Sequence, residues 1–127
     1  MNEAALRPYR EYHAQRERKL RKEREELRLR VLEQTRTAIS RIAPGFPAIR
    51  AVYLFGSVLF PGRFHSESDI DLAVDCEAPE IEAPFARALE GILERDVDLR
   101  PRKGAVARAV ETSGERCYER QVSDPGT

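Results

Sequence analysis

The sequence predicts an α+β domain: a mixed sheet packed on helices, with a long helix at its N-terminal end. Three observations predict this class. Residues 9–42 contain no Gly or Pro and are rich in Arg, Glu, Leu and Lys, which are good helix formers. Residues 49–55 form a short apolar run bounded by turn residues, and residues 69–75 largely alternate between polar and apolar side chains, as strands do. The 127 residues are enough for one domain with a hydrophobic core.

The first predicted helix carries an apolar stripe mainly along its second half. Leu20, Leu27, Val31, Ala38 and Ile42 follow one another at spacings of 7, 4, 7 and 4 residues, which places them on one helical face. The stripe is dense after Leu27, so we expect that part to pack on the domain. The part before Leu27 is rich in Arg, Lys and Glu, and we expect it to form an exposed helical extension.

Turn residues divide the rest of the chain into short elements. Pro44, Gly45 and Pro47 end the first helix. In the strand that contains the sequence DIDLAVD, the acidic residues mostly alternate with apolar ones and therefore share one face. The expected elements are a buried strand at 49–55, a strand at 69–75, a helix at 79–95, a strand at 96–100, a short helix at 104–112 and a frayed tail.

The charges are unevenly distributed along the chain. The 22 Lys and Arg residues balance the 22 Asp and Glu residues, which excludes a protein held to nucleic acid by overall basicity. Residues 1–42 contain 12 basic and 7 acidic residues, whereas residues 66–98 contain 2 basic and 11 acidic residues. A neutral chain is therefore composed of a basic helix and a strongly acidic middle segment.

Several classes of protein are excluded by simple patterns. No apolar run approaches the roughly 20 residues that span a bilayer, and the charged start lacks the apolar core of a signal peptide. The two cysteines, Cys76 and Cys117, match no zinc-site spacing and are too few for a disulfide framework. We therefore expect a cytoplasmic protein without membrane contact.

Three features at the ends of predicted strands indicate chemistry. Gly56 and Ser57 follow the first strand, where a glycine permits close approach and the turn can hold a phosphate. Asp69 and Asp71 are two residues apart on a strand, so their carboxylates share a face, with the Cα atoms roughly 7 Å apart. Such carboxylates repel each other unless a hard cation such as Mg²⁺ neutralises them. Asp98 lies on another apolar strand, where a carboxylate is costly unless it joins such a site.

These residues resemble a known family. LFGSVLFPGRFHSESDIDLAVD (54–75) and VDL (97–99) look like the minimal nucleotidyltransferases of the polymerase-beta-like superfamily, which carry a GS dipeptide, a spacer, DxD on the next strand and a later third acidic residue. The resemblance implies the polymerase-beta-like fold. It divides the chain into a basic helical extension (1–30), a minimal nucleotidyltransferase domain (31–120) and a frayed tail (121–127).

The resemblance also implies roles for the acidic residues. Asp69 and Asp71 would hold metal ions, and Asp98 would be the third carboxylate, which helps to activate the attacking hydroxyl. Asp96 shares the face of Asp98 on the expected strand, but the VDL context favours Asp98. The implied reaction is metal-assisted nucleotidyl transfer, with Mg²⁺ as the cofactor and pyrophosphate as the leaving group.

The implied nucleotide site contains two departures from the family pattern. Gly56 and Ser57 would bind the triphosphate, with Arg63 as the cation nearest to the phosphate tail. Eleven residues, 58–68, separate GS from DxD, which is one more than is usual in the antitoxin branch. The segment after GS reads SVLFPGR, whereas the family often has an arginine closer to the serine.

The short chain has little room for a second substrate domain, so we expect its acceptor to be a partner protein. Minimal nucleotidyltransferases are similar to antitoxins encoded beside HEPN-domain RNases. The reaction that this resemblance implies is transfer of AMP from ATP to a tyrosine of that toxin. Nucleic acid is not an expected partner, because the basic helix lacks aromatic interleaving.

Other readings stay open at this point. The chain could be a catalytically inactive relative that still binds nucleotide. It could also be a binding-only antitoxin, whose N-terminal helix caps the toxin in a fixed ratio. A third hypothesis is self-association through a coiled coil. The sequence argues against it, because Leu20 is the one well-placed apolar residue between positions 13 and 26. The sequence leaves the oligomeric state open.

Overall fold

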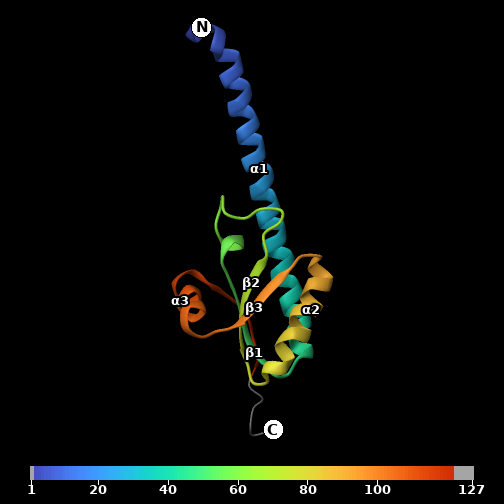
Figure 1. Ribbon diagram of the computed structural model, residues 1–127. Coiled ribbons are helices and arrows are strands. Elements are labelled where there is room, and N and C mark those ends of the chain that lie inside the picture. Colours follow the sequence, from blue (N-terminus) through green and yellow to red (C-terminus); the bar gives the residue numbers. More distant parts are fainter. Residues whose placement is uncertain (1, 122–127) are drawn as a thin grey trace.

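The computed structural model describes residues 2–121 and shows a long helix beside a four-stranded sheet and two shorter helices (Figure 1). The elements are α1 (Glu3–Ile42), β1 (Ile49–Phe55), β2 (Ile70–Cys76), α2 (Glu82–Leu93), β3 (Val97–Pro101), α3 (Gly104–Ser113) and β4 (Glu115–Glu119). Apart from residue 121, the predicted frayed tail lies outside the described residues. Within residues 2–121, no helix has the length and apolar character needed to cross a membrane.

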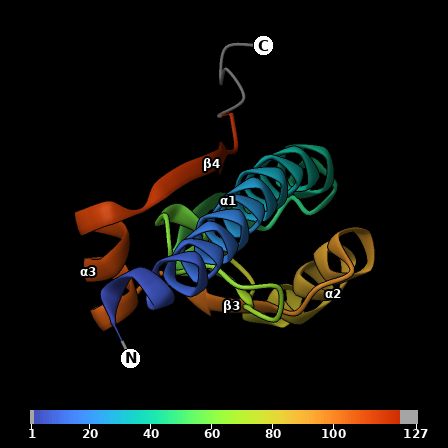
Figure 2. The same ribbon diagram turned by 90° about the horizontal axis from the view of Figure 1, so that it is seen from above.

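The sheet is mixed, which confirms the predicted fold class. Its strand order is β3-β2-β1-β4, with β1 antiparallel to both β2 and β4, and β2 parallel to β3. Ile70, Leu72 and Val74 of β2 are buried in the core with residues of α1 and α2. The intervening residues of β2 face the other side of the sheet, where α3 lies beside Tyr53 of β1. Viewed from above, α2 and α3 lie on opposite sides of the molecule (Figure 2).

One hydrophobic core joins the second half of α1 to the sheet and α2. Ile39 of α1, Leu54 of β1 and Leu72 of β2 are completely buried within it. Phe85 of α2 is also completely buried, and its ring packs edge-to-face against Phe46, with 5.4 Å between ring centroids. The core thus fixes α1 to the sheet face opposite α3.

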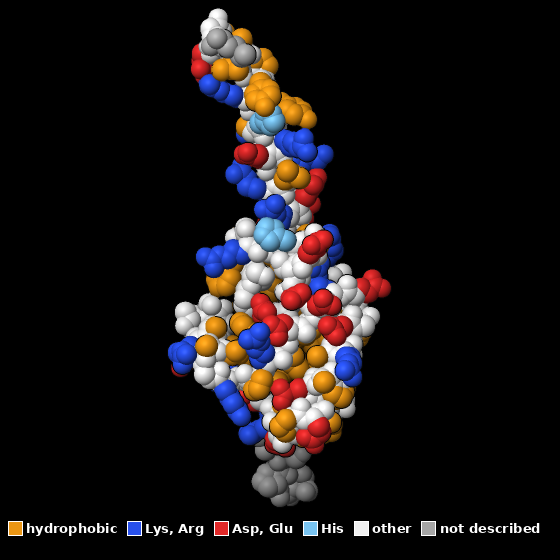
Figure 3. All heavy atoms as spheres, viewed as in Figure 1, with side chains coloured by type: hydrophobic (Ala, Val, Ile, Leu, Met, Phe, Trp, Pro, Cys, Tyr) orange, Lys and Arg blue, Asp and Glu red, His pale blue; other side chains and the backbone are white. Residues whose placement is uncertain are grey.

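The first half of α1, residues 3–26, projects beyond the domain, and we call this segment the arm (Figure 1). Its apolar side chains are open to solvent: Tyr9 is 64% exposed, Tyr12 59% and Leu20 48%. Basic and acidic side chains are intermixed along it (Figure 3). Burial begins at Arg28, in agreement with the apolar stripe that becomes dense after Leu27.

The helix begins at Glu3, before the stretch without Gly or Pro that starts at Tyr9. Asn2 caps it by accepting a hydrogen bond from the backbone N–H of Ala5 at 2.9 Å, which extends α1 back to Glu3. Pro8 therefore lies inside the helix and lacks the N–H that would bond to the carbonyl of Ala4. Ala4 is exposed, so water can satisfy this carbonyl.

The edge strand β4 has no counterpart in the sequence-based prediction. Its sequence, ERCYE, is short and mostly charged, which suits an edge strand but gives no apolar run to detect. Glu115 of β4 pairs with Arg36 of α1, whose Nε donates to Oε2 at 2.7 Å. This ion pair lowers the pKa of Glu115 and fastens α1 to the edge of the sheet.

Burial along α1 predicts two different responses to alanine. Ile39→Ala removes a fully buried side chain and is expected to lower the free energy of unfolding by about 2–5 kcal/mol. Leu20→Ala, on the exposed arm of the same helix, is expected to change it by less than about 0.5 kcal/mol. Urea denaturation followed by circular dichroism measures the free energy of unfolding of both variants. Equal losses of stability would contradict the burial of Ile39 and the exposure of Leu20.

Candidate active site

The turn after β1 brings Gly56 against the carboxylate of Asp71. Gly56 has φ +81°, in the region that favours glycine, and a Cβ at this position would clash with Oδ2 of Asp71. Ser57 follows and begins a 3-10 turn, Ser57–Leu59. Glycine is thus required here both by the backbone conformation and by the neighbouring carboxylate, and it places Ser57 at the end of β1 beside β2.

The pairing of β2 with β3 brings two of the predicted carboxylates together. In the parallel register Asp71 lies opposite Asp98, and both side chains are half-buried. Asp69 lies just before β2 and is exposed. Burial, with the nearby charges of Asp98 and Asp69, raises the pKa of Asp71, while Arg100 partly opposes this effect. The three predicted aspartates therefore interact electrostatically at one edge of the sheet.

Arg100 is a neighbour of this cluster that the sequence analysis did not single out. Its Nε donates to Oδ1 of Asp98 at 3.1 Å, and its Nη2 lies 3.1 Å from Oδ2. The sequence could have indicated this neighbour, because Arg100 is two residues after Asp98 on the same strand and residues two apart on a strand share a face. Asp96, in contrast, lies outside β3 and is exposed, and its backbone carbonyl accepts the N–H of Ile70 at 3.0 Å.

The donor chemistry of the three aspartates fits a divalent cation. Within the described part of the chain, no three His, Cys, Asp or Glu side chains are already grouped as a metal cage. Asp69, Asp71 and Asp98 nevertheless offer only carboxylate oxygens, the ligands that Mg²⁺ prefers. The absence of a side chain at Gly56 leaves space against Asp71. A bound cation would offset the repulsion that raises the pKa of Asp71.

Arg63, the predicted phosphate-binding cation, does not belong to the group of residues that the sheet brings together. It lies on the exposed loop between β1 and β2, and its guanidinium is 5.3 Å from the centroid of the Phe60 ring. This contact places Arg63 against an aromatic ring, whereas Gly56, Asp71 and Asp98 are brought together by the sheet.

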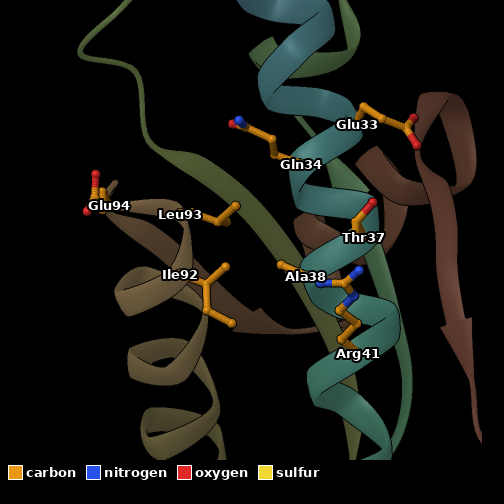
Figure 4. Close-up of a pocket in the computed structure, with 8 residues that line it drawn as sticks. All are labelled: Glu33, Gln34, Thr37, Ala38, Arg41, Ile92, Leu93 and Glu94. Atoms are coloured by element: carbon orange, nitrogen blue, oxygen red, sulfur yellow. The ribbon is translucent and has the colours of Figure 1, made fainter.

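A separate hollow of about 470 Å³ lies between α1 and α2 (Figure 4). Ala38 and Arg41 of α1 border it on one side, and Ile92 and Leu93 of α2 on the other. None of the predicted site residues lines it. The chemistry expected from the sequence therefore belongs to the carboxylate edge of the sheet rather than to this hollow.

Several solved structures are similar to this chain in fold and sequence. A toxin-antitoxin with AMP-PNP contains a chain 30% identical to this one, with a TM-score of 0.56, and a mutant of the toxin-antitoxin MntA-HpeT gives 28% and 0.54. Each alignment covers 68% of this chain and 74% of the other. The toxin-antitoxin MntA-HepT gives 25% identity and a TM-score of 0.50, covering 70% and 73%. No curated protein sequence matches the chain.

Residues 37–122 match the family described as "Polymerase beta, Nucleotidyltransferase". The matched region includes the turn at Gly56 and the strands that carry Asp71 and Asp98. The arm lies outside it. The chain therefore belongs to the polymerase beta nucleotidyltransferase family, in its minimal nucleotidyltransferase branch, and is a nucleotidyltransferase.

Proposed function

We propose that this nucleotidyltransferase transfers AMP from ATP to a tyrosine hydroxyl of a HEPN-type toxin and acts as the antitoxin of that toxin. The observation that carries the proposal is the parallel register that sets Asp71 opposite Asp98, with Gly56 against Asp71. The likeness to a toxin-antitoxin solved with AMP-PNP supports ATP as the nucleotide and a toxin as the partner.

Asp69, Asp71 and Asp98 would hold Mg²⁺ in this proposal. Bound there, Mg²⁺ would supply charge neutralisation at the phosphate under attack and at the leaving pyrophosphate. Three carboxylates at one sheet edge form a donor set of the right chemistry. Burial raises the pKa of Asp71 most, and the nearby charges of Asp98 and Asp69 add to this effect, so a bound cation would favour the ionised carboxylate.

Other groups of the chain would bind the nucleotide and move a proton. The Ser57 hydroxyl and the turn that it begins would hold the triphosphate, and Arg63 would reach the phosphate tail from its exposed loop. Asp98 would accept the proton of the tyrosine hydroxyl. As the phenolic oxygen bonds to the α-phosphorus, the bond from that phosphorus to the bridging oxygen breaks and pyrophosphate leaves.

Replacing the paired aspartates is expected to abolish transfer. Asp71→Asn and Asp98→Asn each remove a charge that stabilises the transition state through a bound cation, so the rate should fall roughly a hundredfold or more. Asp96→Asn is the matched control, because this exposed residue lies just outside β3. The measurement is the mass gain of one AMP on the partner toxin after incubation with ATP and Mg²⁺.

Chelation of Mg²⁺ should stop the wild-type reaction in the same assay. If the wild-type protein adds no AMP to the toxin, or if Asp71→Asn and Asp96→Asn react equally fast, the proposed reaction is wrong.

Gly56→Ala is expected to impair transfer far more than Gly104→Ala. Both glycines have positive φ, +81° and +55°, so alanine costs about 1 kcal/mol or more at either position. The two differ in surroundings, since a Cβ at Gly56 would displace the Asp71 carboxylate and a Cβ at Gly104 meets nothing within 4 Å. Thermal unfolding should show a loss for both variants, larger for Gly56→Ala because of the clash, and AMP transfer at a temperature where both stay folded separates them. Equal activities would show that the contact with Asp71 is unimportant.

A second candidate function, stoichiometric toxin binding without catalysis, is favoured by the arm. This helical segment leaves the domain with Tyr9, Tyr12 and Leu20 exposed, as a surface for a partner would be. In that case the carboxylates would be dispensable for neutralisation and the arm would be essential.

Neutralisation of the toxin in cells distinguishes the two candidates. For the catalytic function, the Asp69→Asn/Asp71→Asn variant should fail to protect cells, although it keeps the arm intact. Deletion of residues 1–24 removes most of the arm while keeping Glu25 with its partner Arg28 and the buried part of α1, so some protection should remain. The opposite pattern, protection by the double variant and none by the deletion, would establish the binding-only function.

A further inference from the structure

The buried guanidinium of Arg28 connects α1 to the turn that follows Gly56. Arg28 is only 7% exposed, and its Nη1 donates to the backbone carbonyl of Val58 at 3.0 Å. We propose that Arg28 is a positioning residue, which holds this turn so that Ser57 is set for the nucleotide. The inference rests on the proposed function, because it takes the turn as the triphosphate site.

Glu25 fixes the direction in which Arg28 points. Nε of Arg28 donates to Oε2 of Glu25 at 2.8 Å, and Nη2 donates to Oε1 of the same carboxylate. The two bonds to Glu25 hold one edge of the planar guanidinium, and the remaining nitrogen, Nη1, donates to Val58. Glu25 is three residues before Arg28, so the pair forms within one helical turn.

The turn is held from two directions, with Ser57 between them. On one side, Gly56 lies against the Asp71 carboxylate. On the other, Val58 is 1% exposed and its carbonyl accepts from Arg28. Within the turn, the N–H of Leu59 bonds to the carbonyl of Gly56 at 3.1 Å. Arg28 therefore acts on the position of Ser57 without a contact of its own to the nucleotide.

Loss of the hydrogen bond from Arg28 to Val58 should be costly, because both residues are buried. Without the guanidinium, the Val58 carbonyl would lose this donor and would be satisfied only if the turn moved or water entered. Movement of the turn shifts Ser57 relative to the Asp71 carboxylate, and a water in place of the guanidinium leaves the turn without its link to α1. Lysine can reach the carbonyl with one donor but cannot form the two parallel bonds to Glu25.

The test compares Arg28→Met with Arg36→Met. Methionine keeps an unbranched side chain and removes the donors. Arg36 lies on the same helix two turns later and pairs with Glu115 of β4, so its loss should weaken the attachment of α1 without touching the turn. The kinetics of AMP transfer from ATP to the toxin with Mg²⁺, the binding of ATP with Mg²⁺ by calorimetry and amide hydrogen exchange are measured for each protein.

Arg28→Met is expected to raise KM and the dissociation constant for ATP about tenfold, as for a lost charge-assisted hydrogen bond, with a smaller change in kcat. Exchange at the amides of Leu59 and Phe60, which close the turn, should become faster. Arg28→Lys should recover part of the loss. Arg36→Met should lower stability and leave KM within about twofold of wild type.

Unchanged KM and unchanged exchange in Arg28→Met would overturn the inference, as would an equal rise of KM in Arg36→Met. Failure of the proposed function would be seen differently, as absence of AMP transfer in the wild-type protein. ATP binding and amide exchange then decide whether Arg28 positions the turn, and wild-type values for Arg28→Met would refute it.

Discussion

The repulsion between carboxylates at one edge of the sheet is the constraint on which the rest of the structure depends. Parallel pairing of β2 with β3 places Asp71 opposite Asp98, and both are partly removed from water. Burial and like charge each disfavour the ionised form of Asp71, which raises its pKa. Placing these carboxylates together therefore costs stability, which other interactions of the fold must offset.

Two features limit that cost. Arg100 pairs with Asp98 and so places a positive charge beside the cluster. Gly56 gives Asp71 room, because any side chain there would collide with its carboxylate. Most of the compensation comes from the opposite face of the sheet, where the alternate residues of β2 enter a core that is completely buried at Ile39 and Phe85. Strand alternation thus separates the costly polar face from the apolar face that stabilises it.

The sequence predicted what depends on local pattern. The strand from Ile49 to Phe55 has the predicted limits, because an apolar β-branched run between turn residues has few other interpretations. The edge strand β4 was missed, since it lacks an apolar run, and the helix cap at Asn2 was not identified. Arg28 was missed for another reason: its partner Val58 is 30 residues away, and no local pattern indicates that a surface-type residue is buried.

The chain has no net charge, but basic residues predominate in one part of it and acidic residues in another. Acidic residues are concentrated in residues 66–98, whereas basic residues are most numerous on α1. Arg28 is a basic residue of this helix that is buried in the domain. Because α1 is one continuous helix, the arm and the buried segment share one axis (Figure 1). The residues that fix α1 on the sheet therefore set the direction of the arm. Arg28 bonds that same helix to the turn at Val58. The position of the arm is therefore fixed relative to the candidate nucleotide site.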